Sequence, residues 1–230
     1  MKSTAGSDAA KQRAGEAAAE EVTDGMVVGL GTGSTTAYAI KALGERVDSG
    51  LDVAGVPTSF GARQLAIDQG IDLVGLDEVD RIDLAIDGAD QFVVETGDCI
   101  KGGGAAHTRE KIVAAAADDF AVVVDETKLA DELEYPVALE VIPAAQPGVE
   151  TAVETAGGTP RLRQAANKDG PVVTDNGNLV IDCAFGPITD PKTVALELVE
   201  IPGVVEHGLF VGRTTTAYVG TEDGLNVHRY

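Results

Sequence analysis

The first half of the chain alternates short apolar runs with segments that carry helix signals. In segment 59–69, for example, Ser59 suits a helix N-cap and Gly70 suits a helix stop. Because strand and helix follow one another repeatedly, the pattern predicts an α/β fold: a Rossmann-like, mostly parallel sheet with helices on both faces. The expected strands are 26–30, 52–56, 72–74, 82–87 and 120–124.

The order of elements changes after Asp131, where the order strand, helix, strand, strand, helix, strand predicts a smaller α+β domain with an antiparallel, ferredoxin-like sheet. Asn176-Gly177 is a strong hairpin signal, and Asp190-Pro191 suits the start of a helix. The expected elements are strands 137–142, 161–163, 171–174 and 179–183 and helices 147–156 and 190–200. Strands 209–211 and 216–219 are expected to return to the first domain. The predicted domains are therefore an α/β catalytic domain of residues 1–131 and 208–230 and an inserted α+β domain of residues 132–207.

The chain is strongly acidic, with a formal net charge of −21 and a pI near 4.3. Such a charge repels nucleic acid and anionic membranes, so neither is an expected partner. No apolar run reaches membrane-spanning length and no secretory signal is visible, which leaves the cytoplasm as the expected location. The excess of 38 acidic over 17 basic residues is typical of proteins from salt-loving organisms, where salt screens self-repulsion.

One central stretch holds several groups suited to proton transfer. Asp87 and Asp90 come at a strand end, where open α/β sheets bind their ligands. Lys101 precedes a run of glycines, 102–104, whose N–H groups can approach an anion, and Glu110 lies early in the next helix. Carboxylates beside a lysine and a glycine nest suit proton shuttling next to a small anionic substrate.

Each of these pieces also has a plain structural interpretation. The tetrapeptide Asp87-Gly88-Ala89-Asp90 alone is more typical of a turn with capping aspartates. Lys101 with its glycines is as typical of a flexible loop, and Glu110 alone is typical of a solvated helix start. The order and closeness of the pieces on one β-α unit favour a functional site.

A glycine-rich loop, Gly31-Thr32-Gly33-Ser34-Thr35, follows the first expected strand and leads into a helix. Strand, glycine loop and helix form the architecture of a phosphate-binding turn. A dinucleotide site is rejected, because the pattern that starts with Gly29 and Gly31 has Ser34 in place of its third glycine, and because Asp52 begins the next strand instead of ending it. The hydroxyl groups suit a terminal phosphate or sugar oxygens. A tight turn with Ser34 as the helix N-cap is compatible with either interpretation.

Several separated motifs resemble the signatures of the type A ribose-5-phosphate isomerase family, in the family's order over nearly the whole chain. The central motifs are Asp87-Gly88-Ala89-Asp90, Lys101-Gly102-Gly103-Gly104 and Arg109-Glu110-Lys111-Ile112-Val113. The flanking motifs are Gly31-Thr32-Gly33-Ser34-Thr35, Asp125-Glu126-Thr127-Lys128, Thr174-Asp175-Asn176-Gly177-Asn178 and Ile201-Pro202-Gly203-Val204-Val205. Together with the acidic composition, the resemblance leads us to expect a halophilic archaeal source.

The resemblance implies reversible conversion of D-ribose 5-phosphate and D-ribulose 5-phosphate, a step of the non-oxidative pentose phosphate pathway, through an enediolate. It implies Glu110 as the base and Asp87 as the group for ring opening and proton transfer between O1 and O2. Asp90 would bind hydroxyl groups and orient Lys101, which would stabilise the enediolate oxygen. The residues expected to bind substrate are Thr32, Gly33, Ser34, Thr35, Asp87, Gly88, Ala89, Asp90, Lys101, Gly102, Gly103, Gly104 and Lys128. No metal or organic cofactor is implied, and the implied assembly is a homodimer or homotetramer.

The chain departs from the family pattern at Gln91, where Glu is usual, at Ala105-Ala106-His107, and at Thr127, where Ser is common. None of these changes removes a proposed catalytic group, and His107 is expected to cover the helix start rather than to line the site. The motif Thr174-Asp175-Asn176-Gly177-Asn178 is interpreted as structural. Cys99 and Cys183 lie among apolar residues and are interpreted as buried free thiols.

Two rival functions are weighed against the isomerase. A non-catalytic sugar-phosphate sensor would use the same phosphate loop, but it has no need for Glu110 together with Asp87 and Lys101. A deaminase or lactonase acting on phosphosugars would favour a histidine-centred acid-base group, which the sequence does not display. Binding without turnover would support the sensor, and ammonia release from an amino sugar would support the deaminase.

The acidic composition predicts that stability depends on salt. We expect the free energy of unfolding to rise by about 2 kcal/mol between 0.1 M and 2 M KCl, because screening weakens repulsion among surface carboxylates. For a chain of this size that gain raises the melting temperature by roughly 4–8 °C. Thermal unfolding monitored by circular dichroism checks it, with sucrose as a control co-solvent that carries no ions. Full stability in low-salt buffer would contradict the halophilic interpretation.

Overall fold

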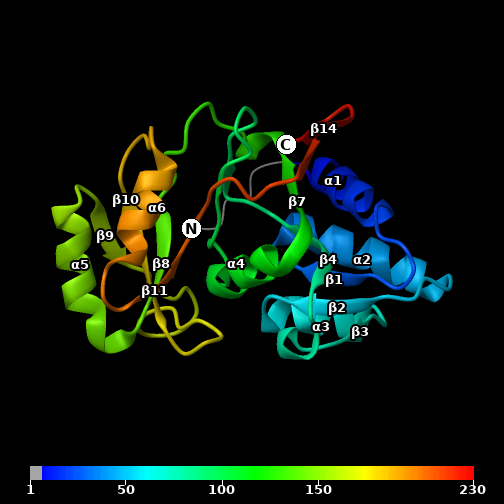
Figure 1. Ribbon diagram of the computed structural model, residues 1–230, viewed down its shortest axis with the longest axis horizontal. Coiled ribbons are helices and arrows are strands. Elements are labelled where there is room, and N and C mark those ends of the chain that lie inside the picture. The colour runs from blue at the N-terminus through cyan, green and yellow to red at the C-terminus, as the bar shows by residue number, and fades with distance from the viewer. Residues whose placement is uncertain (1–6) are drawn as a thin grey trace. The chain divides into compact units, whose positions relative to one another are not determined.

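The computed structural model describes residues 7–230, which divide into two compact units (Figure 1). The larger unit contains residues 7–89, Arg109–Leu129 and Gly212–Tyr230. The smaller unit contains Asp90–Thr108 and Ala130–Val211. The chain therefore passes from one unit to the other directly after Ala89 and directly after Thr108.

The larger unit is built on a seven-stranded sheet with strand order β14-β13-β7-β4-β1-β2-β3. Its strands are β1 Val27–Leu30, β2 Ala54–Pro57, β3 Asp72–Leu73, β4 Ile82–Asp87, β7 Ala117–Asp125, β13 Thr216–Gly220 and β14 Leu225–Arg229. All neighbours pair in parallel except β13 and β14, which form an antiparallel hairpin at one edge. The predicted Rossmann-like, mostly parallel sheet is confirmed.

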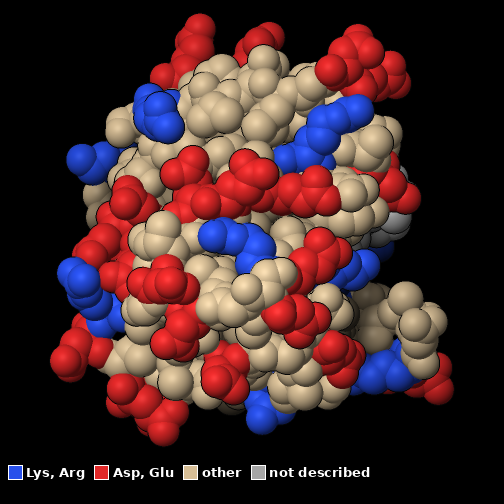
Figure 2. All heavy atoms as spheres, turned by 90° about the vertical axis from the view of Figure 1, so that its right-hand side faces the viewer, with Lys and Arg blue, Asp and Glu red and all other residues tan. Residues whose placement is uncertain are grey.

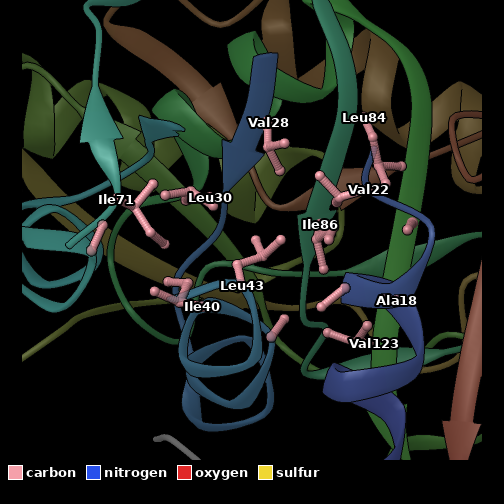
Figure 3. Packing of buried hydrophobic residues seen from close by; sticks show 14 of the residues in the cluster. Ala18, Val22, Val28, Leu30, Ile40, Leu43, Ile71, Leu84, Ile86 and Val123 are labelled. Carbon is pink, nitrogen blue, oxygen red and sulfur yellow. The ribbon is translucent and has the colours of Figure 1, made fainter. Parts of the chain in front are cut away.

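Helices cover both faces of this sheet. One face packs against α1 Asp8–Glu20, α2 Ser34–Asp48 and α3 Phe60–Asp68, whose apolar side chains form one buried cluster with the strands. Figure 3 shows Ala18 from α1, Val22 just after that helix, and Ile40 and Leu43 from α2 against sheet residues. The other face packs against α4 His107–Ala116. The approach is close: a methyl group on Gly29 would lie 2.5 Å from Val113 Cγ1.

The smaller unit contains an antiparallel four-stranded sheet with order β11-β8-β10-β9. Its elements are β8 Val137–Val141, α5 Gln146–Thr155, β9 Thr159–Leu162, β10 Leu179–Ala184, α6 Pro191–Val199 and β11 Val204–His207. The βαββαβ order and the antiparallel sheet agree with the predicted ferredoxin-like α+β domain. A separate sheet of order β12-β6-β5 pairs β5 Gln91–Phe92, β6 Cys99–Ile100 and β12 Leu209–Phe210. Short 3₁₀ helices complete the two units: η1 Leu76–Glu78 and η2 Glu126–Lys128 in the larger unit, and η3 Pro143–Ala145 in the smaller one.

Two expected strands behave differently in the structure. The segment expected as strand 171–174 makes only isolated bridges, Gln164 with Pro171 and Val173 with Leu179, because proline lacks a donor and the following turn bends toward β8. The segment expected to return at 209 instead pairs with Cys99 and Ile100 in the smaller unit, where Leu209 and Phe210 are buried. The division of the structure thus groups Asp90–Thr108 with the smaller unit, and the domain limits drawn from the sequence stay a prediction.

The surface and the thiols follow the composition. Asp and Glu side chains are spread over the face drawn in Figure 2, with fewer Lys and Arg among them. Cys99 and Cys183 are free and buried, as predicted, and burial raises the pKa of the Cys183 thiol to about 12. Across residues 7–230, none of the helices is long and apolar enough to cross a membrane.

Candidate active site

The larger unit holds the Asp87 carboxylate with two backbone donors. Strands β1 and β4 are parallel neighbours, so the loop after β1 and the end of β4 share one edge of the sheet. The Thr32 N–H donates to Asp87 Oδ1 over 3.0 Å, and the Gly88 N–H donates to the same oxygen over 2.7 Å. Asp87 is only 3% exposed. Its carboxylate is therefore fixed in direction before any ligand binds.

Gly31 allows this close approach of loop and strand. Its N–H donates to the Ile86 carbonyl over 3.0 Å, and a Cβ atom on it would lie 2.2 Å from Asp87 Oδ1 and Cγ. No side chain fits in that space, so the contact between the β1 loop and Asp87 requires glycine at position 31.

The Thr32 hydroxyl is part of a small network that the sequence did not reveal. It donates to Ser59 Oγ over 2.7 Å and lies 2.8 Å from Thr58 Oγ1. Thr58 and Ser59 directly follow β2, the next strand of the sheet, and Ser59 also caps α3 as predicted. The sequence does place Thr58 and Ser59 directly after an expected strand. Ligand-binding residues gather at the carboxyl ends of such strands, so this position was the available signal for a role in the site.

The start of α2 carries the features of an anion site. Gly33, not Ser34, is the N-cap of this helix, so the alternative in which Ser34 caps the turn is wrong. No side chain caps the first turn of α2, and Ser34 itself is exposed. Because the first N–H groups of a helix lack intrahelical partners, a phosphate can accept from them here.

Glu110 lies in the first turn of α4 and is 3% exposed. Helix N-termini favour the ionised form of a carboxyl group. Just before the helix, Ala105 has φ +58°, which makes it the one non-glycine residue with positive φ in the described chain. Backbone strain of this kind gathers at functional sites. The neighbouring Arg109 guanidinium lies 5.5 Å from the Phe60 ring centre.

Lys128 lies shortly after the end of β7, the strand beside β4. It is half-buried in η2, which begins where the Thr127 N–H donates to Asp125 Oδ1 over 3.0 Å. The larger unit thus carries the Thr32 loop, Asp87 and Lys128 on three neighbouring strands.

The smaller unit carries Asp90, Lys101 and the glycine loop. Asp90 Oδ2 accepts from the Gly103 N–H over 2.6 Å, so this donor serves Asp90 and does not face an open space. Lys101 is 3% exposed, and its ammonium group lies 5.4 Å from the Phe210 ring centre. Burial strengthens the field of this cation, because little water screens it.

A clamp that the sequence did not predict holds the glycine loop. Arg163 Nη1 donates to the carbonyl oxygens of Gly102 and Gly103 over 2.8 Å and 3.3 Å. The other side of the same guanidinium pairs with Asp182, with Arg163 Nε 2.9 Å from Oδ2. The sequence predicts Arg163 only as part of a short strand. A lone arginine and a distant aspartate give no local signal of an ion pair.

Gln91 and His107, two of the departures from the family pattern, have structural roles in the smaller unit. His107, the first residue of α4, is fully buried, with Nε2 3.3 Å from the Glu206 carbonyl oxygen. Gln91 Oε1 accepts from the N–H groups of Glu134 and Tyr135, each over 2.8 Å. Burial and then the charges of nearby carboxylates, Asp90 among them, raise the pKa of the Tyr135 phenol, which stays neutral. Within residues 7–230, no group of three or more His, Cys, Asp or Glu side chains is arranged to hold a metal ion.

Known proteins resemble this chain over nearly its full length. The family model of ribose 5-phosphate isomerase A (phosphoriboisomerase A) matches residues 54–224. The chain is 64% identical over 222 residues to ribose-5-phosphate isomerase A of Haloarcula marismortui, covering 96% of each. It superposes on ribose 5-phosphate isomerase A of Methanocaldococcus jannaschii with a TM-score of 0.92 at 45% identity, over 96% of this chain and 98% of that one. A solved D-ribose-5-phosphate isomerase in complex with phospho-erythronic acid gives a TM-score of 0.94 at 44% identity, over 98% and 100%.

The contact between Gly31 and Asp87 predicts a large effect of one methyl group. We expect Gly31→Ala to lower the free energy of unfolding by about 1–3 kcal/mol, because the new Cβ overlaps the Asp87 carboxylate. Gly148→Ala in α5 is the matched control, since its Cβ meets nothing within 4 Å and alanine favours a helix by about 1 kcal/mol. Thermal unfolding in 2 M KCl measures both variants. Equal stability of the two would contradict the close packing described here.

Proposed function

The chain belongs to the ribose 5-phosphate isomerase A family, and we propose that it uses Glu110 as the base in interconverting D-ribose 5-phosphate and D-ribulose 5-phosphate. The reaction is an aldose–ketose isomerisation through an enediolate. The observation that carries the assignment of the base is a carboxylate, 3% exposed, in the first turn of a helix that follows directly on the glycine loop.

The base moves one proton between neighbouring carbons. In the open-chain aldose, Glu110 takes the proton from C2 and the C1 carbonyl becomes an enediolate oxygen. The same carboxylic acid then returns the proton to C1, while the C2 oxygen becomes the ketone. Burial keeps water from exchanging the proton during transfer.

Asp87 is proposed to move protons between oxygens. Ring opening of the furanose requires that the O1 hydroxyl lose a proton and that the ring oxygen gain one. Conversion of the enediolate also transfers a proton from O2 to O1. The N–H groups of Thr32 and Gly88 hold Asp87 Oδ1, so one carboxylate oxygen anchors the group and the carboxylate keeps a fixed direction.

Lys101 and Asp90 are proposed to bind the reacting oxygens from the smaller unit. An enediolate carries negative charge that the ground state lacks, so a preorganised cation lowers the barrier. The Lys101 ammonium is buried, and the Asp90 carboxylate is held by the Gly103 N–H. The Arg163 clamp on Gly102 and Gly103 supports the same loop.

The phosphate end is proposed to bind at the start of α2. Thr32, Gly33, Ser34 and Thr35 supply N–H and hydroxyl donors there, and Lys128 supplies a positive charge. The related structure in complex with phospho-erythronic acid supports a phosphorylated sugar as the substrate. These local donors offset the repulsion that a net charge of −21 exerts on an anionic substrate.

We also propose a homodimer or homotetramer in the cytoplasm. Exposed apolar residues on the smaller unit, Ile142, Leu196, Val199 and Val205, support association with another copy. Light scattering after size-exclusion chromatography in 2 M KCl reports the mass, and a monomer would contradict this assembly.

Glu110→Gln tests the assigned base. The substitution keeps the shape of the side chain but removes its basicity, so we expect kcat to fall by about 10²–10⁴-fold. Formation of ribulose 5-phosphate is followed in 2 M KCl with EDTA, and circular dichroism checks that the variant is folded. Glu154→Gln, on an exposed position of α5, is the matched control and should retain full activity.

The other outcomes discriminate among the alternatives. Equal activity of wild type and Glu110→Gln would move the base elsewhere, first to Asp87. A folded wild type that binds the sugar phosphate without turnover would support the sensor. Activity that EDTA abolishes and a divalent ion restores would contradict the metal-free route.

A further inference from the structure

A buried carboxylate in the smaller unit contacts the start of α4. Glu140, in β8, is 0% exposed, and the Thr108 hydroxyl donates to its Oε2 over 2.6 Å. Its Oε1 accepts from the Thr174 hydroxyl over 2.9 Å and from the Asn178 amide over 2.8 Å. The Asn176 amide donates to both oxygens, over 3.0 Å and 3.3 Å. One carboxylate thus links the Thr174–Asn178 turn to the first turn of a helix.

This carboxylate is held as an anion by neutral donors. Burial raises the pKa of the Glu140 carboxyl, but the hydrogen bonds from Thr108, Asn178, Asn176 and Thr174 outweigh burial, and the pKa lies below its usual value. In the described chain no lysine or arginine pairs with it. A buried charge is a costly way to fill a core, since apolar residues of similar volume are often as stable. Packing alone therefore does not account for a carboxylate at this position.

The Thr108 contact reaches Glu110 through the backbone. Both residues lie in the first turn of α4, and two steps of about 100° place their side chains on opposite sides of the helix. Glu140 therefore holds the turn from the side of the helix opposite to Glu110. The bond to Thr108 is short because its acceptor is charged, which makes it a directional restraint.

We propose that Glu140 is a positioning residue for proton transfer: through Thr108 it fixes the first turn of α4 and hence the direction of the Glu110 carboxylate. The inference rests on the proposed role of Glu110 as the base. The Thr174–Asn178 turn supplies the other donors to Glu140, which keep this buried carboxylate ionised, while Thr108 alone connects it to α4.

Thr108→Val tests the link, because valine keeps the shape of threonine and removes only the hydroxyl. We expect kcat to fall by about tenfold or more, since small misplacement of a catalytic group has effects of this size. We expect KM to change by less than about threefold, because Thr108 is not assigned to substrate binding. Thr108→Ser restores the hydroxyl and should restore kcat.

Asn178→Ala is the matched control. It removes a bond of 2.8 Å to the other oxygen of the same carboxylate and leaves the bond from Thr108 intact. We expect it to lower the melting temperature as much as Thr108→Val does, while kcat stays within about threefold of wild type. A loss of kcat in Thr108→Val alone therefore reports positioning and not general loss of stability.

Three results would overturn the inference. One is a Thr108→Val variant with the kcat of wild type; another is a loss of kcat in proportion to melting temperature in both Thr108→Val and Asn178→Ala. The third is a kcat that Thr108→Ser fails to restore. Wild type and Glu110→Gln are assayed beside them: an active wild type with inactive Glu110→Gln and unaltered Thr108→Val removes this inference alone, whereas an active Glu110→Gln removes the assigned base as well.

Discussion

Two backbone N–H groups, those of Thr32 and Gly88, bind one oxygen of Asp87. Much of the larger unit must be folded correctly for that contact to form. The donors come from the loop after β1 and from the residue after β4, so the contact exists only if these strands pair in parallel and in register. Pairing in turn needs the crossover through α2 and α3 and the apolar cluster beneath them. Gly31 is the local condition, because only the absence of a side chain lets the loop reach the carboxylate.

The smaller unit uses partly buried and buried charges in a comparable way. Arg163 and Asp182 form an ion pair whose remaining guanidinium donor binds the carbonyl oxygens of the glycine loop, and Glu140 binds the start of α4. The Arg163–Asp182 pair and Glu140 each form hydrogen bonds with groups that lie next to proposed catalytic residues in the chain. Buried polar networks that are fully satisfied specify one arrangement of the chain more strictly than apolar packing does. Such networks can hold Lys101 and Glu110 to the narrow tolerances that proton transfer requires.

The sequence predicted the elements and the candidate catalytic groups, and it missed the groups that hold them. Alternating strand and helix signals and the Asp87–Asp90 and Lys101 motifs are local, so they can be interpreted from neighbouring residues. Thr58 and Ser59 bind Thr32 across 26 and 27 residues, Arg163 binds Gly102 across 61, and Glu140 binds Thr108 across 32. No local pattern encodes such pairs. The expected strand at 171–174 failed for a related reason, since a distant carboxylate holds the turn that follows it.

The acidic surface of the chain repels an anionic substrate, which needs positive charge for binding. Burial of the binding groups separates them from the surface charge. At 1 M salt the Debye length is about 3 Å, so surface carboxylates hardly influence a ligand in the site. Lys101 is 3% exposed and its charge keeps its field, because ions cannot surround it. The same screening removes the long-range attraction between Lys101 and a phosphate. Chloride, another anion, is abundant at such salt concentrations. At the proposed phosphate site, discrimination against chloride would therefore depend on directed donors, such as the first N–H groups of α2 with the hydroxyls around Thr32.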